Sequence, residues 1–261
     1  MDLIKIDEKN NRVLNCEPQL INSKIIFNGE NNVLICEENV VLNGTIINFY
    51  GDNSIIYLSS NYNHYKLFVN IFNNSVLFMD ENIYFSSKLF LILSEEKSIF
   101  IGKDCLFSHG VAVRLADPHL IYDMDSMKRI NPSEDVYFGD HVWIGQDALI
   151  LKGTNVGSGS IVGARAVVSN KNVKSNSIVA GVPPKEIKKN IFFDGRSVHK
   201  YTKNETEQSM QYSSDKWIYS RKNSKTGFKK IDEINKIDCV DLKIEKIIEL
   251  RNDKNKNRFY I

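Results

Sequence analysis

Histidine is the residue of this sequence best suited to acid–base chemistry, because the pKa of free imidazole lies near neutral pH. One of the five histidines, His119, stands where a regular repeat of apolar residues gives way to a polar segment. Asp117 precedes it by two residues, so both side chains face the same side of an extended strand. Asp117 could orient the imidazole or stabilise its protonated form, or it could begin a turn before Pro118. His119 is therefore the candidate general base. Surface or structural roles are expected for His64 and His199, and structural or site-lining roles for His109 and His141.

The repeat that positions these residues runs through "FGDHVWIGQDALILKGTNVGSGSIVGARAVVSN". Its large apolar members recur every six residues, at Phe138, Ile144, Ile150, Val156, Val162 and Val168. A helix would repeat near 3.6 residues and an amphipathic strand at two. A period of six predicts short parallel strands wound into a coil, with large side chains inside and glycines relieving crowding at the corners. The predicted fold class is an all-β solenoid of hexapeptide repeats.

The same register appears upstream at Ile101, Phe107 and Val113, and it breaks at His119. The polar run "IYDMDSMKRINPSED" then predicts a protruding loop over about 120–136. Short β-rich runs between residues 24 and 100, separated by Asn- and Gly-rich turns, predict earlier and less regular coils. The coils are expected to end near Pro183 and Pro184. We therefore expect a β-helix domain over 1–190 and a partly helical C-terminal extension over 191–261, including a helix in "VDLKIEKIIELRN".

The composition excludes several classes of protein. A formal net charge of +2 argues against a general nucleic-acid binder, although the extension carries a basic run that includes Lys225. No apolar run approaches the ~20 residues of a membrane span, and the N-terminus lacks the apolar core of a signal peptide. A cytoplasmic location is expected. The four cysteines lie far apart in the sequence, which favours free thiols over disulfides or a metal cluster.

The regular coils and the following "IVAGVPPKEIKKN" resemble the left-handed β-helix acetyltransferases of the hexapeptide-repeat superfamily. The longer stretch from "IGKDCLFSHG" to "FFDGRSVHKYT" is similar to the meningococcal sialic-acid capsule O-acetyltransferases. This resemblance implies a left-handed coil and a homotrimer with active sites between subunits. It also implies acetyl-CoA bound along the coils and a histidine base in a D-x-H segment, here Asp117-Pro118-His119. Residues beyond about Glu205 match no part of the family pattern.

The resemblance also implies roles for residues of the coils. Trp143 faces outward one step before Ile144, and the family has a tryptophan there beside the cofactor; packing between subunits is the alternative. The family's coenzyme A positions fall on Gln146, Ala164, Ser169, Asn170, Lys185 and Lys188. The turn at Asn170 is about one residue longer than usual, so Lys171 could take its place. A solvated basic face is the alternative role for the lysines. Arg114, Lys128 and Arg129 could bind an anionic acceptor.

These features predict an acetyl-CoA-dependent O-acetyltransferase with a bacterial surface glycan as acceptor, such as a sialic-acid-containing capsular polysaccharide. The sequence does not separate this activity from N-acetylation of an amino sugar or nucleotide sugar. A zinc carbonic anhydrase on the same solenoid would need a close H-x4-H pair, whereas His109 and His119 lie ten residues apart, so no metal is expected. A non-enzymatic glycan- or protein-binding solenoid is the third class, and His119 at the loop base and "GVPPK" argue against it.

Overall fold

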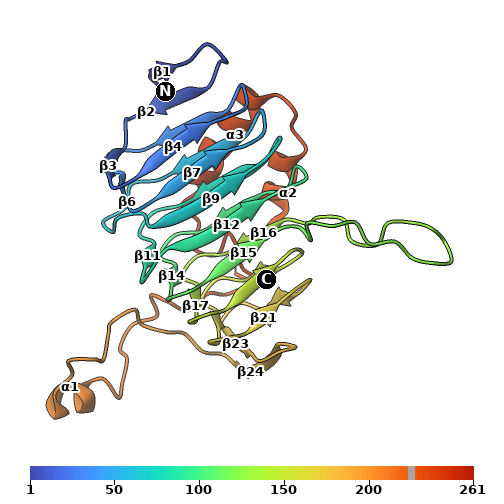
Figure 1. Ribbon diagram of the computed structural model, residues 1–261. Coiled ribbons are helices and arrows are strands. Elements are labelled where there is room, and N and C mark those ends of the chain that lie inside the picture. The colour runs from blue at the N-terminus through green and yellow to red at the C-terminus, as the bar shows by residue number, and fades with distance from the viewer. Residues whose placement is uncertain (223–226) are drawn as a thin grey trace.

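The computed structural model describes residues 1–222 and 227–261, so Lys225 of the basic run lies outside the described residues. The chain winds into a solenoid of stacked strands (Figure 1). Among the strands of these residues, only the β1–β2 and β23–β24 pairs are antiparallel, and all other pairs are parallel. The predicted all-β solenoid is confirmed.

The strands form three long sheets and one short pair. The nine-stranded sheet contains β1 (Leu3–Ile6), β2 (Arg12–Asn15), β5 (Val33–Cys36), β8 (Ile55–Leu58), β10 (Val76–Met79), β13 (Ile99–Ile101), β16 (Val136–Phe138), β19 (Asn155–Val156) and β22 (Asn172–Val173). The seven-stranded sheet contains β4 (Lys24–Phe27), β7 (Ile46–Phe49), β9 (Leu67–Ile71), β12 (Leu89–Leu93), β15 (Ala112–Arg114), β18 (Leu149–Leu151) and β21 (Val167–Val168). The six-stranded sheet contains β11 (Tyr84–Phe85), β14 (Leu106–Phe107), β17 (Trp143–Ile144), β20 (Ile161–Val162), β23 (Ser177–Ala180) and β24 (Lys185–Lys189). The short pair is β3 (Gln19–Ile21) with β6 (Val41–Asn43).

The six-residue repeat marks the core of the solenoid. All six of its large side chains, Phe138, Ile144, Ile150, Val156, Val162 and Val168, are fully buried, as are Ile101, Phe107 and Val113 upstream. Phe138 pairs with Val156 and Ile144 with Val162, so three six-residue units complete one coil. Burying one such side chain stabilises the fold by roughly 1.5–3 kcal/mol. His119, the next position in the register, is exposed, because the chain leaves the coil there.

Glycine allows the coils to approach closely at the corners. A Cβ on Gly145 would lie 2.6 Å from the backbone nitrogen of Ala164 in the next coil. That distance is far below a van der Waals contact, so the corner between β17 and β18 requires glycine.

The N-terminal coils are longer than the 18-residue coils of the regular repeat. Phe27 pairs with Phe49 in the next coil, and Phe49 pairs with Ile71 in the one after it, so each of these coils takes 22 residues. The Phe27 and Phe49 rings stack at 4.6 Å inside the coil. At one corner Asn31 accepts a hydrogen bond from Asn10 at 2.8 Å and donates one to Asn53 at 2.7 Å. All three asparagines adopt positive φ, which asparagine tolerates better than most residues. The Asn-rich turn signals therefore correspond to a ladder of corner residues.

The predicted loop is a long hairpin between β15 and β16 that projects from the solenoid (Figure 1). A β-bridge between Tyr122 and Arg129 joins its two arms. Met124 at its far end is 90 % exposed, as expected for a segment that does not belong to the core.

The C-terminal extension contains α1 (Lys203–Gln208), α2 (Lys229–Asn235) and α3 (Val240–Asn252). α3 coincides with the helix expected in "VDLKIEKIIELRN". Ile231 of α2 and Ile247 of α3 are fully buried against the outer face of the nine-stranded sheet, where Phe78 and Phe100 lie. α1 buries no residue and projects away from the solenoid (Figure 1). No helix of the described residues is long and apolar enough to cross a membrane.

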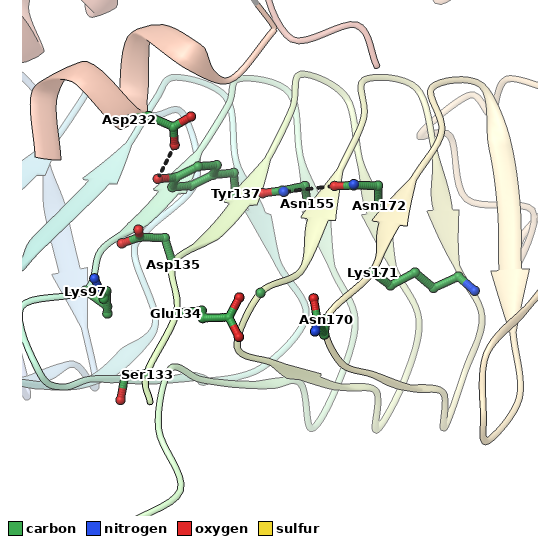
Figure 2. A pocket seen from close by; sticks show the side chains of 11 residues that line it. Lys97, Ser133, Glu134, Asp135, Tyr137, Asn155, Asn170, Lys171, Asn172 and Asp232 are labelled. Atoms are coloured by element: carbon green, nitrogen blue, oxygen red, sulfur yellow. Dashed lines mark hydrogen bonds between the residues drawn. The ribbon is translucent and has the colours of Figure 1, made fainter. Parts of the chain in front are cut away.

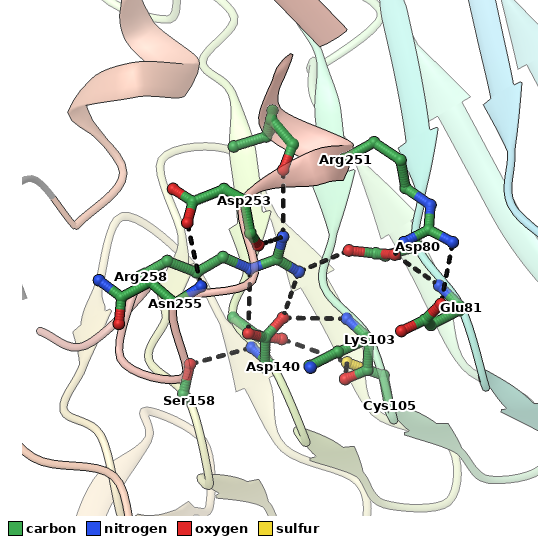
Figure 3. A network of polar contacts seen from close by, with 12 residues as sticks. Asp80, Glu81, Lys103, Cys105, Asp140, Ser158, Arg251, Asp253, Asn255 and Arg258 are labelled. Atoms are coloured by element: carbon green, nitrogen blue, oxygen red, sulfur yellow. Dashed lines mark hydrogen bonds and ion pairs between the residues drawn. The ribbon is translucent and has the colours of Figure 1, made fainter. Parts of the chain in front are cut away.

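A buried ionic cluster fastens the extension to the solenoid (Figure 3). The guanidinium of Arg258 donates to both carboxylate oxygens of Asp140, at 2.8 and 3.1 Å, and also to Asp80. Its remaining donors reach the carbonyl oxygens of Leu250 and Asp253. Asp80 and Asp140 are essentially inaccessible to solvent, so Arg258 compensates the charge of Asp140 and shares that of Asp80 with Arg251, which lies 3.3 Å from Asp80. We call Arg258, Asp80 and Asp140 the Arg258 clasp.

Candidate active site

The predicted base lies at the root of the hairpin. β15 ends at Arg114, and Asp117 and His119 follow as exposed residues where the chain leaves the coil. The carboxylate of Asp117 accepts a hydrogen bond from Lys152 Nζ at 2.7 Å and from Asn131 Nδ2 at 3.3 Å. The hydrogen bond from Lys152 lowers the pKa of Asp117, which keeps it ionised. Within the described residues no hydrogen bond joins this carboxylate to the imidazole of His119.

Asn131 organises the hairpin root, although the sequence offered no signal for this role. It is 5 % exposed. Its Nδ2 donates to the carbonyl of His119 at 2.8 Å, and its Oδ1 accepts from the backbone N–H of Ile121 at 2.9 Å. Its own carbonyl accepts from Lys152 at 3.2 Å. Asn131 thus fixes the backbone from His119 to Ile121 and links it, through Lys152, to the next coil.

The predicted acceptor-binding cations have different surroundings. The guanidinium of Arg129 makes two hydrogen bonds to the carboxylate of Glu95, at 2.6 and 2.9 Å. Arg129, together with Ser133, lowers the pKa of Glu95 to about 2. An anionic acceptor would have to share Arg129 with this carboxylate, whereas Lys128 on the hairpin and Arg114 on β15 are exposed.

Trp143 occupies a different face of the solenoid, on β17 of the six-stranded sheet. Its side chain is outward-facing and 37 % exposed, and its Nε1 donates to Ser108 Oγ at 3.0 Å. It lines a cavity of about 700 Å³ together with Phe193 of the extension. Asp117 lines another cavity, beside Glu95 and Arg129. A single chain therefore does not bring Trp143 and the His119 segment together.

The predicted coenzyme A residues fall into three groups. Gln146 and Ala164 lie one above the other at the corner that links the six- and seven-stranded sheets, where the carbonyl of Gln146 accepts from Arg165 N at 2.7 Å. Ser169, Asn170 and Lys171 lie at the next corner, after β21. Lys185 and Lys188 are exposed on β24. Gln146, Ala164 and the two lysines of β24 are all exposed.

Asn170 and Lys171 also line a polar cavity of about 320 Å³ (Figure 2). Its other residues include the carboxylates of Glu134, Asp135 and Asp232, which would repel the phosphates of coenzyme A. The side chain of Lys171 points away from these carboxylates, and its Nζ donates to the carbonyl of Pro184 at 2.9 Å. Lys171 thus borders the cavity, while its amino group is held by Pro184, just before β24.

Two further features bear on the chemistry. Within residues 1–222 and 227–261 no group of three or more His, Cys, Asp or Glu is arranged to hold a metal ion. His141 is buried, and burial lowers its pKa to about 4, which keeps its imidazole neutral near pH 7.

Comparison with known proteins supports the fold and its relationships. No family model matches the chain. A polysialic acid O-acetyltransferase of Neisseria meningitidis is 47 % identical over 45 residues, 17 % of this chain and 21 % of that protein. A protein of the same name from Escherichia coli O1:K1 / APEC is 42 % identical over 83 residues, 32 % of this chain and 27 % of that protein. The matched segments thus span 21 % and 27 % of these curated relatives, about a quarter of their length.

Solved structures match over a larger part of the chain. The crystal structure of the polySia-specific acetyltransferase NeuO is 29 % identical with a TM-score of 0.63, over 73 % of this chain and 90 % of that one. The polysialic acid O-acetyltransferase OatWY, 24 % identical with a TM-score of 0.54, covers 73 % of this chain and 96 % of that one and supports the fold. The chain is a left-handed β-helix protein of the hexapeptide-repeat type, related to the polysialic acid O-acetyltransferases.

Proposed function

We propose that this protein transfers an acetyl group from acetyl-CoA to a hydroxyl of a sialic-acid-containing bacterial capsular polysaccharide, in the cytoplasm. The observation that carries the proposal is the position of Asp117-Pro118-His119 at the root of the projecting hairpin, in a β-helix that matches 90 % of a polySia-specific acetyltransferase. In this proposal residues 1–190 hold the chemistry and the hairpin over about 120–136 closes over the acceptor.

His119 acts as the general base. Its imidazole takes the proton of the acceptor hydroxyl as the oxygen attacks, and it returns that proton to the departing sulfur. Acetyl-CoA supplies the reactive thioester. Asn131 holds the backbone of His119 in place, and the ion pair between Asp117 and Lys152 holds the preceding turn. Gln146, Ala164, Lys185 and Lys188 bind the donor, and Ser169, Asn170 and Lys171 belong to the same proposed donor site.

The site is proposed to lie between subunits of a homotrimer. Trp143 and His119 occupy different faces of one chain, so a second copy is needed to bring them together. The seven-stranded sheet also presents an outward row of apolar residues. In this row the rings of Phe68 and Phe90 lie 5.6 Å apart, and Phe90 is followed by Ala112 and Leu149. Phe90 is 43 % exposed, which suits a face that packs against another copy.

The test measures release of coenzyme A from acetyl-CoA with a panel of acidic and neutral bacterial polysaccharides, for the wild type and His119→Ala. We expect release with a sialic acid polymer and a loss of at least 10²-fold in the variant, with acetyl-CoA binding retained. Release with an amino sugar or nucleotide sugar alone would establish N-acetylation instead. A protein that binds glycan but not acetyl-CoA would be a binding solenoid.

A further inference from the structure

A second wall, supplied by the C-terminal extension, turns the surface around Trp143 into a cavity. Residues 193–199 run opposite the six-stranded sheet, and the space between them has a volume of about 700 Å³. Trp143 and Tyr84 line it from the sheet, and Phe193, Arg196 and His199 line it from the extension. Cavities of this size that combine aromatic and polar groups commonly hold small molecules or short segments of a polymer.

The floor of the cavity is a row of outward-facing side chains in register. Tyr84 pairs with Leu106 and Leu106 with Trp143, so one coil separates each member from the next. Tyr84 and Trp143 therefore lie two strand spacings apart, about 10 Å. Tyr84 is 47 % exposed and Trp143 37 % exposed. The apolar face of a pyranose ring packs well on an aromatic ring, so two such rings in a row suit consecutive sugars of a chain.

The opposite wall is held rigidly. The imidazole of His141 is stacked between Phe193, at 3.9 Å, and Trp217, at 3.6 Å, with the planes nearly parallel. His141 Nε2 also lies 2.9 Å from the carbonyl of Phe193. This arrangement fixes two separate segments of the extension beside the sheet. The wall is therefore preformed, which reduces the entropy lost on ligand binding.

Arg196 places a positively charged guanidinium on this wall, where it could bind the carboxylate of an acidic sugar. Its guanidinium pairs with Asp194 at 3.1 Å and remains largely exposed. A guanidinium has five N–H donors, so contact with Asp194 leaves donors for a ligand carboxylate. His199 is exposed on the same wall.

The cavity and the proposed donor site lie on opposite sides of Trp143 along the six-stranded sheet. The row of Tyr84, Leu106 and Trp143 continues past Trp143 to Ile161 and Ile178, and β24 with Lys185 and Lys188 lies beyond. The proposed donor positions thus extend from Trp143 toward β24, whereas the cavity extends from Trp143 toward Tyr84.

We propose that this cavity is an acceptor subsite for an acidic oligosaccharide, with Tyr84 and Trp143 as stacking platforms and Arg196 as the partner of a sugar carboxylate. The assignment rests on the proposed acetyl transfer, because Trp143 is the point at which the donor and acceptor would meet. The extension is then part of the substrate site and not only a cover for the nine-stranded sheet.

Calorimetric titration of sialic acid oligomers of defined length, without acetyl-CoA, tests the proposal directly. We expect Tyr84→Ala and Arg196→Gln each to raise Kd at least about 10-fold, and Arg196→Gln to have little effect on a neutral oligosaccharide. Tyr50→Ala and Arg221→Gln are matched controls, because Tyr50 is 50 % exposed after β7 and Arg221 is exposed outside the cavity. Both controls should bind as the wild type does.

Kinetics on the same four variants separate this proposal from the acetyl transfer. The two cavity variants should raise the KM for the acceptor and leave the KM for acetyl-CoA within about twofold, as expected for lost acceptor binding. If the wild type is active and the two cavity variants have the same acceptor KM as the control variants, the subsite is overturned and the proposed acetyl transfer stands. Oligomer binding that depends on Tyr84 and Arg196, without any release of coenzyme A, would keep the subsite and overturn the transferase. A wild type that binds no oligomer, or cavity variants that raise the KM for acetyl-CoA instead, would overturn the subsite.

Discussion

Lys152 and Asp117 form an ion pair of 2.7 Å that ties the root of the hairpin to the next coil of the solenoid. The two residues are 35 positions apart in the sequence, and Lys152 also reaches the carbonyl of Asn131. The pair therefore sets where the segment that carries His119 leaves the coil. It is partly exposed, so its main effect is on geometry rather than on stability.

Removal of either partner should slow transfer. We expect Lys152→Met and Asp117→Asn each to lower kcat about 10-fold at unchanged affinity for acetyl-CoA, because a misplaced base loses orientation. The double variant should be no slower than the slower single variant, since the two residues act as one unit. Lys24→Met, at an exposed lysine of β4, is the control. Additive losses in the double variant would show that the two residues act separately.

Asn131 should matter for both stability and rate. In Asn131→Ala the carbonyl of His119 and the N–H of Ile121 lose their partner at a part-buried site, and the loss of these hydrogen bonds costs about 1 kcal/mol of unfolding free energy. We also expect a fall in kcat, because the backbone of His119 is no longer fixed. Urea denaturation and steady-state kinetics measure the two effects. Normal kcat in a destabilised variant would limit Asn131 to a structural role.

If the active site combines residues of two copies, inactive variants of different residues should complement each other in a mixed trimer. His119→Ala and Trp143→Ala should each be inactive alone, and mixed trimers of the two should regain part of the activity. The reason is that some interfaces then combine an intact His119 from one copy with an intact Trp143 from another. Co-expression followed by assay tests this, with light scattering expected to give about three times the 29.9 kDa mass of one chain. Continued inactivity in a mixed trimer would place both residues in the same copy's site.

The Arg258 clasp should dominate the stability of the extension. Arg258→Met leaves the buried Asp140 without its ion-pair partner and leaves Asp80 with Arg251 alone, at 3.3 Å, and breaking such a buried pair costs about 3–5 kcal/mol. Lys230→Met, which breaks a more exposed pair with Asp253, should cost less than about 1 kcal/mol. Denaturation followed by fluorescence measures both changes. Adding Asp140→Asn to Arg258→Met should recover part of the loss, and an equal loss in the Arg258 and Lys230 variants would contradict the role of burial.

His141 predicts a specific dependence of stability on pH. Burial lowers its folded-state pKa to about 4, while the unfolded imidazole titrates near 6.5. The unfolded state therefore binds more protons between these values, so the unfolding free energy falls as the pH drops from about 6.5 to about 4, by on the order of 3 kcal/mol. Its stabilising effect is fully present above pH 6.5.

The control for this slope is a pair of asparagine variants. His141 has a φ of 55°, which asparagine tolerates, so His141→Asn removes the titrating group with the least backbone strain. Its unfolding free energy should lose most of the slope between pH 4 and 6.5, whatever its absolute stability. His199→Asn, at an exposed histidine, should keep the slope. Equal slopes in both variants would assign the effect to other groups.

The sequence predicted the solenoid because a six-residue period is local and repeated. Each large residue of the repeat, such as Ile144 or Val162, is buried where the period places it. The hairpin was also predictable, because its polar residues cannot fill the inside of a coil. By contrast, Arg258 reaches Asp80 across 178 residues, and no local pattern encodes such a contact. The same holds for the stack of Phe193, His141 and Trp217, whose members come from three separate segments.

For the candidate site, sequence patterns identified residues that stand out in the repeat, and the family resemblance supplied their roles. His119 is at the break of the register, and Trp143 is an outward aromatic on an otherwise regular strand. Neither pattern indicates that His119 and Trp143 lie on different faces of the solenoid. Their placement depends on how the strands of each coil are distributed over the three long sheets. Asn131 could not be predicted, because one asparagine among many in this sequence carries no periodic signal.

The Arg258 clasp also sets an order of events during translation. Asp80 and Asp140 leave the ribosome well before Arg258, and at about 5–20 residues per second the 178 residues after Asp80 take on the order of ten seconds or more. Until then the apolar outer face of the nine-stranded sheet, with Phe78 and Phe100, has no cover from α2 and α3. The nascent chain thus lacks the buried ion pair between Arg258 and Asp140 until the last residues of the extension are made. Synthesis of the extension is the step that ends this exposure.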